Sequence, residues 1–250
     1  VDTRIEECRP GPGGWTRRGV DTPRPGTATL ASLAEPALAD DPLADRYWIA
    51  CAGFLVPDRL MLARAGPHVL RVLKSQPAVF DAAGMHAEQR FATSADGTRV
   101  PYFVVHPAGA PARPAPTLLH GYGGFEIPLL PSYLQSVGPA WLEAGGRYVV
   151  ANIRGGSEYG PAWHRAALRD QRQRAVDDFV AVAQALVADG LASPATLGIQ
   201  GGSNGGLLVG NVMLQRPDLF GAVVCQVPLL DMRRYHRLLA GASWMAEYGD

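Results

Sequence analysis

The chain has 250 residues, and its 23 basic and 23 acidic side chains give a formal net charge of zero. This balance gives no reason to expect a nucleic acid or an anionic membrane as a partner. The three cysteines, Cys8, Cys51 and Cys225, are odd in number and widely spaced, which argues against a disulfide framework and a zinc site. No signal peptide and no apolar run of membrane-spanning length is visible, so we expect a cytoplasmic location and no membrane contact.

The first part of the chain predicts sheet without helices. Residues 1–45 are rich in Pro, Gly, Ala and charged residues, and only 27–33 alternate as a strand does. From residue 47 onward, short segments of strand length are separated by turn residues, at 47–52, 59–63 and 68–73. This pattern indicates a β-rich segment.

A hairpin is predicted next. Residues 86–93 and 99–106 both have strand character, and Asp96-Gly97 lies in the turn between them. Asp-Gly between two alternating strands is a strong hairpin signal because both residues tolerate the backbone conformations that tight turns require.

Beyond Pro116 the pattern alternates between strands and helices. Four apolar runs, at 117–120, 148–153, 196–200 and 222–227, suit strands that are buried on both faces. Helices are predicted between them, and the clearest is 175–189, whose apolar residues repeat at helical spacing until Gly190. Such alternation predicts an α/β architecture with a largely parallel sheet.

The most informative stretch is Gly201-Gly202-Ser203-Asn204-Gly205-Gly206. It matches the G-x-S-x-G nucleophile elbow, in which a serine occupies a sharp turn between a strand and a helix. The flanking segments fit, because a short strand precedes it and the apolar run 207–214 predicts a helix after it. The pattern predicts a serine hydrolase in which the Asn204 backbone N–H helps to stabilise the oxyanion. The alternative is a glycine-rich loop that only turns.

Several further motifs lie around this elbow. Together they closely resemble the prolyl oligopeptidase family of serine peptidases, over about residues 76–250. The motifs are Gly121-Tyr122-Gly123-Gly124-Phe125, residues 151–160 (ANIRGGSEYG), Trp163-His164, Val176-Asp177-Asp178-Phe179, the elbow itself and residues 215–220 (QRPDLF).

The resemblance implies an architecture. The family has a β-propeller ahead of an α/β-hydrolase domain, so residues 1–75 would be the last propeller strands and residues 76–250 the peptidase domain. We expect the α/β-hydrolase fold to be incomplete at the C-terminus, and most of the propeller to be absent.

The resemblance also implies roles for individual residues. Ser203 would be the nucleophile, and the Asn204 N–H and the Tyr122 hydroxyl would be the oxyanion donors. A phenol suits this role because it donates a hydrogen bond while uncharged. The family's pocket for a proline ring would correspond to Phe125, Trp244, Tyr248 and Leu229. No cofactor and no metal is implied, and the substrates would be short peptides that are cleaved after proline.

The base and the acid of a catalytic triad are not evident. In this fold they follow the serine in the order Asp and then His. After Ser203 the only histidine is His236, with Asp218, Asp231 and Asp250 as acids, and none occupies a matching position. We therefore expect the triad Asp and His to be absent from these residues, and we expect the isolated polypeptide to have little activity.

Other functions stay open at this point. An acylaminoacyl peptidase, a dipeptidyl peptidase or an esterase could use the same scaffold, and a catalytically inactive, peptide-binding remnant belongs to a different class. The sequence does not indicate the oligomeric state.

Overall fold

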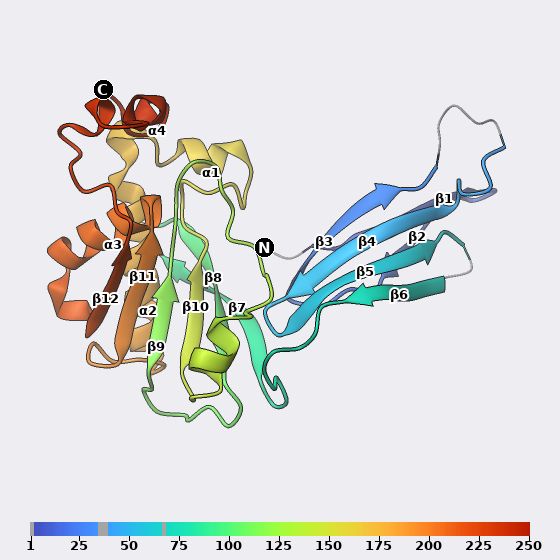
Figure 1. Cartoon of the computed structure of the whole chain (residues 1–250), viewed down its shortest axis with the longest axis horizontal. Coiled ribbons are helices and arrows are strands. Elements are labelled where there is room, and N and C mark those ends of the chain that lie inside the picture. The colour runs from blue at the N-terminus through green and yellow to red at the C-terminus, as the bar shows by residue number, and fades with distance from the viewer. Residues whose placement is uncertain (1–2, 35–39, 67–68) are drawn as a thin grey trace. The chain divides into compact units, whose positions relative to one another are not determined.

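The computed structural model describes residues 3–34, 40–66 and 69–250 (Figure 1). The chain divides into two compact units. The first unit is residues 1–81 together with 130–139, and the second unit is residues 82–129 together with 140–250. The predicted domain boundary at residue 75 stays a prediction, and no sequence pattern indicated that residues 130–139 belong to the first unit.

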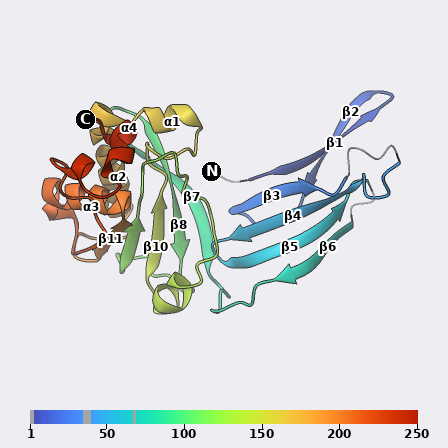
Figure 2. The same cartoon turned by 45° about the horizontal axis from the view of Figure 1, so that its top comes forward.

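The first unit is built from antiparallel strands. A four-stranded sheet has the order β3-β4-β5-β6 (Figure 2), and a separate hairpin pairs β1 with β2. The strands are β1 (Ile5–Gly11), β2 (Gly14–Val20), β3 (Gly26–Ser32), β4 (Arg46–Gly53), β5 (Val56–Arg64) and β6 (Val69–Ser75). Alternate side chains of β4 and β5 point to one face, and Ile49, Cys51, Met61 and Ala63 form its buried core with Ile5 and Val20.

The strands predicted at 27–33, 47–52 and 59–63 are confirmed as β3, β4 and β5. The prediction at 68–73 matches β6, although residue 68 lies outside the described residues. The hairpin of β1 and β2 was not predicted. Most of its residues are exposed, so neither strand has the alternation of apolar and polar residues that a half-buried strand shows.

Residues 130–139 belong to the first unit through specific contacts. The Thr27 hydroxyl donates to the Pro131 carbonyl oxygen at 2.7 Å, and the Leu134 N–H donates to the Phe54 carbonyl oxygen at 3.1 Å. Tyr133 stacks on Phe80 with ring centroids 5.2 Å apart. The segment is therefore fixed by both backbone and side-chain interactions.

The second unit contains a six-stranded sheet with the order β12-β11-β9-β10-β8-β7. Its strands are β7 (His86–Thr93), β8 (Arg99–His106), β9 (Thr117–His120), β10 (Arg147–Ala151), β11 (Leu197–Gly202) and β12 (Ala222–Gln226). The four strands from β9 to β12 are parallel, whereas β7, β8 and β10 pair in antiparallel fashion.

Two long helices bury their apolar faces in the core of the second unit. They are α2 (Gln173–Ala188) and α3 (Asn204–Gln215). Phe179 of α2 and Val209 of α3 are fully buried in one cluster with Leu119 and Ile199 of the sheet. Two short helices, α1 (Pro161–Arg165) and α4 (Met245–Tyr248), lie near the same end of the sheet (Figure 1). Among the described residues, no helix is long and apolar enough to span a membrane.

The hairpin of β7 and β8, the largely parallel sheet and both predicted helices are confirmed. One expectation is wrong: β12 is not buried on both faces. Val224 is 43% exposed, and exposed residues alternate with half-buried ones along the strand. The reason is position, because β12 is the outermost strand of the sheet on that side within the described ranges.

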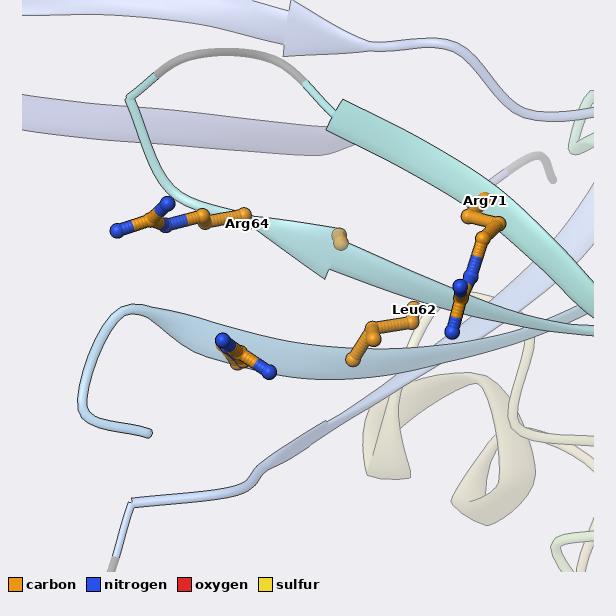
Figure 3. A pocket seen from close by; sticks show the side chains of 5 residues that line it. Leu62, Arg64 and Arg71 are labelled. Atoms are coloured by element: carbon orange, nitrogen blue, oxygen red, sulfur yellow. The ribbon is translucent and has the colours of Figure 1, made fainter. Parts of the chain in front are cut away.

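A cavity of about 270 Å³ lies in the first unit (Figure 3). Its lining residues are Arg46, Leu62, Ala63, Arg64 and Arg71. They come from β4, β5 and β6, and Arg64 is paired with Asp45. None of these lining residues belongs to the second unit, which contains Ser203.

Candidate active site

Ser203 lies between β11, which ends at Gly202, and α3, which begins at Asn204. Its backbone has φ 57° and ψ −116°, a conformation that residues other than glycine rarely adopt. Its N–H donates to the Gln226 carbonyl oxygen at 3.0 Å, and the residue is exposed. The predicted arrangement of strand, sharp turn and helix is therefore present, with the serine accessible to solvent.

Two glycines of the elbow are required by close backbone contacts. A Cβ atom at Gly201 would lie 2.1 Å from the Gly205 carbonyl oxygen. A Cβ atom at Gly205 would lie 2.6 Å from the Gly121 carbonyl oxygen. Because both neighbours are backbone atoms, they cannot swing away as a flexible side chain would. The glycines thus allow the elbow and the loop after β9 to approach each other.

The loop after β9 brings Tyr122 to the serine. The Tyr122 hydroxyl lies close enough to Ser203 for the serine side chain to influence its pKa. Burial raises the pKa of the Tyr122 phenol; the neighbouring Ser203 side chain opposes this shift, and the charge of Glu247 adds to it. The phenol therefore stays protonated at neutral pH and is able to donate a hydrogen bond.

Asn204 is the first residue of α3 and is fully buried. Its N–H belongs to the first turn, where backbone N–H groups have no acceptor within the helix. Its side-chain amide donates to the Tyr122 carbonyl oxygen at 2.6 Å. The structure thus brings together the three residues predicted for nucleophile and oxyanion donors.

Aromatic side chains gather near this group. Phe125 and Tyr248 meet edge to face, with ring centroids 5.6 Å apart, and Tyr235 meets Tyr248 in the same way at 5.5 Å. Leu229 and Trp244 line a cavity of about 170 Å³ together with Tyr235. The four residues predicted for a proline pocket are therefore linked through Tyr235, which the sequence did not single out because it lies in no motif.

The polar partners of these aromatic side chains were also missed. Glu247, only 4% exposed, lies beside Tyr248 on α4 and contacts Arg172 and His164. The one local sign that Glu247 has a special role was its position as a charged residue within the aromatic segment 244–248. Its partners lie about 75 and 83 positions earlier in the chain, so no short-range pattern reveals them.

Arg154 anchors a second loop near the site. It is 4% exposed, and it forms ion pairs with Asp178 at 2.6 Å and Asp96 at 2.5 Å. Burial lowers the pKa of Arg154, but hydrogen bonds and charges from the two aspartates outweigh this effect, so the net shift is upward. This pairing fixes the start of the loop 154–160.

The remaining candidate acids and bases have other partners. Asp218 pairs with Arg216, Asp231 pairs with Arg234, and His236 accepts from Arg237. None of these bonds involves Ser203. Within the described part of the chain, no group of three or more His, Cys, Asp or Glu side chains is placed to hold a metal ion.

Comparisons with known proteins identify a family and several relatives. The model of the family described as the prolyl oligopeptidase family matches residues 134–250. An uncharacterized peptidase of Sinorhizobium fredii is 50% identical over 250 residues, which are all of this chain and 34% of that protein. A prolyl endopeptidase of Elizabethkingia miricola is 44% identical over 164 residues, which cover 65% of this chain and 23% of the relative.

Solved structures are similar over nearly the whole chain. One prolyl endopeptidase superposes with a TM-score of 0.84 and 43% identity, covering 93% of this chain and 33% of the other. A post-proline cleaving enzyme from Rickettsia typhi gives a TM-score of 0.82 at 38% identity, covering 99% and 35%. The chain thus spans about a third of the length of these proteins.

The second unit has the α/β-hydrolase fold. The antiparallel sheets of the first unit correspond to the β-propeller part of the similar solved structures. The family match, the relatives and the solved structures point to one conclusion: residues 134–250 of this chain belong to the prolyl oligopeptidase family.

Proposed function

We propose that Ser203 is the nucleophile of a serine peptidase that hydrolyses short peptides on the carboxyl side of proline. The observation that carries the proposal is the exposed Ser203 at a strained elbow, with the Tyr122 phenol beside its side chain. Relatives described as prolyl endopeptidases and a post-proline cleaving enzyme support the substrate class.

The proposed reaction has two stages. The Ser203 oxygen attacks the peptide carbonyl carbon, and the carbonyl oxygen becomes an oxyanion that accepts hydrogen bonds from the Asn204 N–H and the Tyr122 hydroxyl. The C–N bond then breaks, the amine leaves with a proton, and an acyl-enzyme remains. Water hydrolyses this ester and restores the serine hydroxyl. No cofactor is needed, because the co-reactant is water.

A serine needs a base to take its proton. Of the described histidines, His106 contacts Glu88, His164 contacts Glu247 and His236 contacts Arg237. The other two are His86, which stacks on His106, and His120, which stacks on Tyr148. We propose that the triad Asp and His lie outside these 250 residues. The polypeptide of 250 residues would then retain binding and oxyanion stabilisation without full activity.

Specificity would come from the aromatic pocket. Phe125 and Tyr248 present flat apolar faces, and Leu229 and Trp244 line the adjoining cavity. A pyrrolidine ring is compact and apolar, so it gains contact area against such walls without losing a hydrogen bond.

The test uses the complete natural polypeptide that contains these residues. We expect a fluorophosphonate probe to label Ser203, and the variant Ser203→Ala to stay unlabelled at the same thermal stability. A panel of succinylated dipeptide nitroanilides that differ in the residue before the scissile bond measures selectivity. Cleavage after proline supports the proposal, and a preference for another residue would indicate an acylaminoacyl peptidase, a dipeptidyl peptidase or an esterase. Absence of labelling would instead favour a peptide-binding protein.

A further inference from the structure

Glu247 is a buried carboxylate that the proposed reaction does not use. Its Oε1 accepts hydrogen bonds from the Phe125 N–H at 2.9 Å and from the Arg172 guanidinium at 3.1 Å. Its Oε2 lies 2.8 Å from the His164 Nε2. Glu247 therefore joins α4 to the loop after β9, to α1 and to the residue before α2.

The bond to Phe125 holds an unfavourable backbone conformation. Phe125 has φ 57° and the next residue, Glu126, has φ 58°. Residues other than glycine adopt such angles only where surrounding interactions compensate for the strain. Because Phe125 is one wall of the aromatic group, the Glu247 carboxylate fixes the direction of that wall.

The Asn204 side chain forms a second junction, separate from its backbone N–H. Its Oδ1 accepts a hydrogen bond from the Tyr248 hydroxyl at 2.8 Å and another from the Arg172 guanidinium. Its Nδ2 donates to the Tyr122 carbonyl oxygen at 2.6 Å. Asn204, which follows Ser203, is thus bound both to Tyr248 and to the loop after β9 that carries Tyr122.

Arg172 connects the two junctions. One of its terminal nitrogens contacts Glu247 and the other contacts Asn204. The side chain is 17% exposed, and its guanidinium lies 5.4 Å from the centroid of the Tyr248 ring. A planar guanidinium suits this position because it donates in two directions and also stacks on an aromatic face.

We infer that Glu247 and Arg172 are positioning residues that set the selectivity of the aromatic pocket for proline. The inference rests on the proposed function. Both oxygens of Glu247 are occupied by groups of the protein, so it acts on the reaction only through the residues that it holds, which are Phe125, His164 and Arg172. Loss of either charge leaves the other buried without its partner, and the pocket walls lose their fixed orientation.

The test compares Arg172→Met and Glu247→Gln with wild type in the complete natural polypeptide. We expect KM for a proline nitroanilide to rise about tenfold to a hundredfold, with a smaller change in kcat, because a displacement of about 1 Å is enough for such losses. We also expect the ratio of kcat/KM for the proline substrate to kcat/KM for the alanine substrate to fall. Labelling of Ser203 by a small fluorophosphonate, which does not enter the pocket, stays close to the wild-type rate.

Two conservative variants keep the test independent of folding. Arg172→Lys retains the cation and is expected to recover part of the selectivity. Tyr248→Phe removes only the hydroxyl that bonds Asn204, and we expect a smaller loss of selectivity in the same direction. Arg216→Met is the matched control, because Arg216 also pairs with a carboxylate, Asp218, but both side chains are considerably exposed.

The possible outcomes separate the two proposals. Wild-type selectivity in Arg172→Met and Glu247→Gln, with Ser203 labelled, overturns the positioning role and leaves the proposed function intact. Loss of labelling in folded Glu247→Gln to the level of Ser203→Ala also overturns it, since the carboxylate would then help to activate the serine. A wild-type protein that is neither labelled nor active overturns the proposed function itself.

Discussion

Asp178 accepts three hydrogen bonds from Arg154: one from the backbone N–H at 3.0 Å, and two from the guanidinium at 2.9 and 2.6 Å. Asp178 is fully buried, and Arg154 is nearly so. The pair links α2 to the loop after β10, and both elements flank the candidate active site.

We predict that Asp178→Asn destabilises the protein. Removing the buried carboxylate leaves the Arg154 charge with only Asp96 as its counter-charge, and the expected loss in the free energy of unfolding is about 3 kcal/mol. Asp96→Asn is the matched control, because Asp96 binds the same arginine but is 44% exposed. Urea unfolding at neutral pH measures the free energy of unfolding of both variants. Equal losses in the two variants would contradict the importance of burial.

The Asp96 carboxyl gives a pH prediction. Hydrogen bonding to Arg154 is the main reason why the pKa of Asp96 lies well below its usual range. The folded-state pKa is thus lower than the unfolded one, so the stabilisation is present above about pH 4 and is lost as the pH falls below that value. We expect the difference in unfolding free energy between wild type and Asp96→Asn to shrink between pH 6 and pH 2.5. A constant difference would argue against this linkage.

Glu158 provides a prediction of the opposite sign. Burial raises the pKa of its carboxyl group, and Oε2 has no hydrogen-bond partner among the described residues. Ionisation therefore costs stability as the pH rises above the normal range of glutamate. We expect Glu158→Gln to stabilise the protein at pH 8 by about 1 kcal/mol, and less at pH 5.

Glu88→Gln is the control for that experiment. Burial acts to raise the pKa of Glu88, but hydrogen bonds from Arg90 and His106 outweigh it, and the net shift is downward. We therefore expect Glu88→Gln to lower the stability at pH 8. Thermal unfolding of the two variants at both pH values would show opposite signs; the same sign would contradict the assigned causes.

Close packing at the elbow predicts that alanine is not tolerated at Gly201, and Gly198 of the same strand β11 is the matched comparison. In Gly201→Ala the new Cβ would lie 2.1 Å from a backbone oxygen, whereas in Gly198→Ala the nearest atom is 3.7 Å away. We expect Gly201→Ala to lose at least about 2 kcal/mol of stability and its probe labelling. Gly198→Ala should be close to neutral in both measurements, and similar behaviour of the two variants would refute the explanation.

Tyr122→Phe tests the phenol as an oxyanion donor. We expect kcat in the complete natural polypeptide to fall about a hundredfold to a thousandfold with little change in KM, since the donor acts mainly in the transition state. Tyr159→Phe is a suitable control, because Tyr159 is 51% exposed and contacts Trp163. An unchanged kcat in Tyr122→Phe would remove this residue from the mechanism.

The elbow could be predicted because its constraints are local. Ser203 needs small residues within two positions on either side, and Gly201 and Gly205 show this directly in the sequence. The strands of the second unit were predictable for a similar reason, because burial imposes continuous apolar runs. The exposed strand β12 shows the limit of that reasoning: an apolar run does not reveal whether a neighbour covers it.

The polar contacts that hold Phe125 and Tyr248 could not be predicted from the sequence. Arg172 and Glu247 are 75 positions apart, and Arg172 and Asn204 are 32 positions apart. Their meeting depends on how the loop after β9, α2 and α4 converge, which is a property of the tertiary fold. Single charged residues in such segments look the same in the sequence as solvated ones.

Because residues 130–139 belong to the first unit, neither unit is a single continuous segment of the chain. The chain passes between the units three times, after residues 81, 129 and 139. Cleavage at any one of these crossings therefore cannot release an intact unit. Anyone who wishes to express the hydrolase part alone must replace the ten-residue detour with a short linker, or Tyr133 and Leu134 will be produced without the Phe80 and Phe54 partners that hold them.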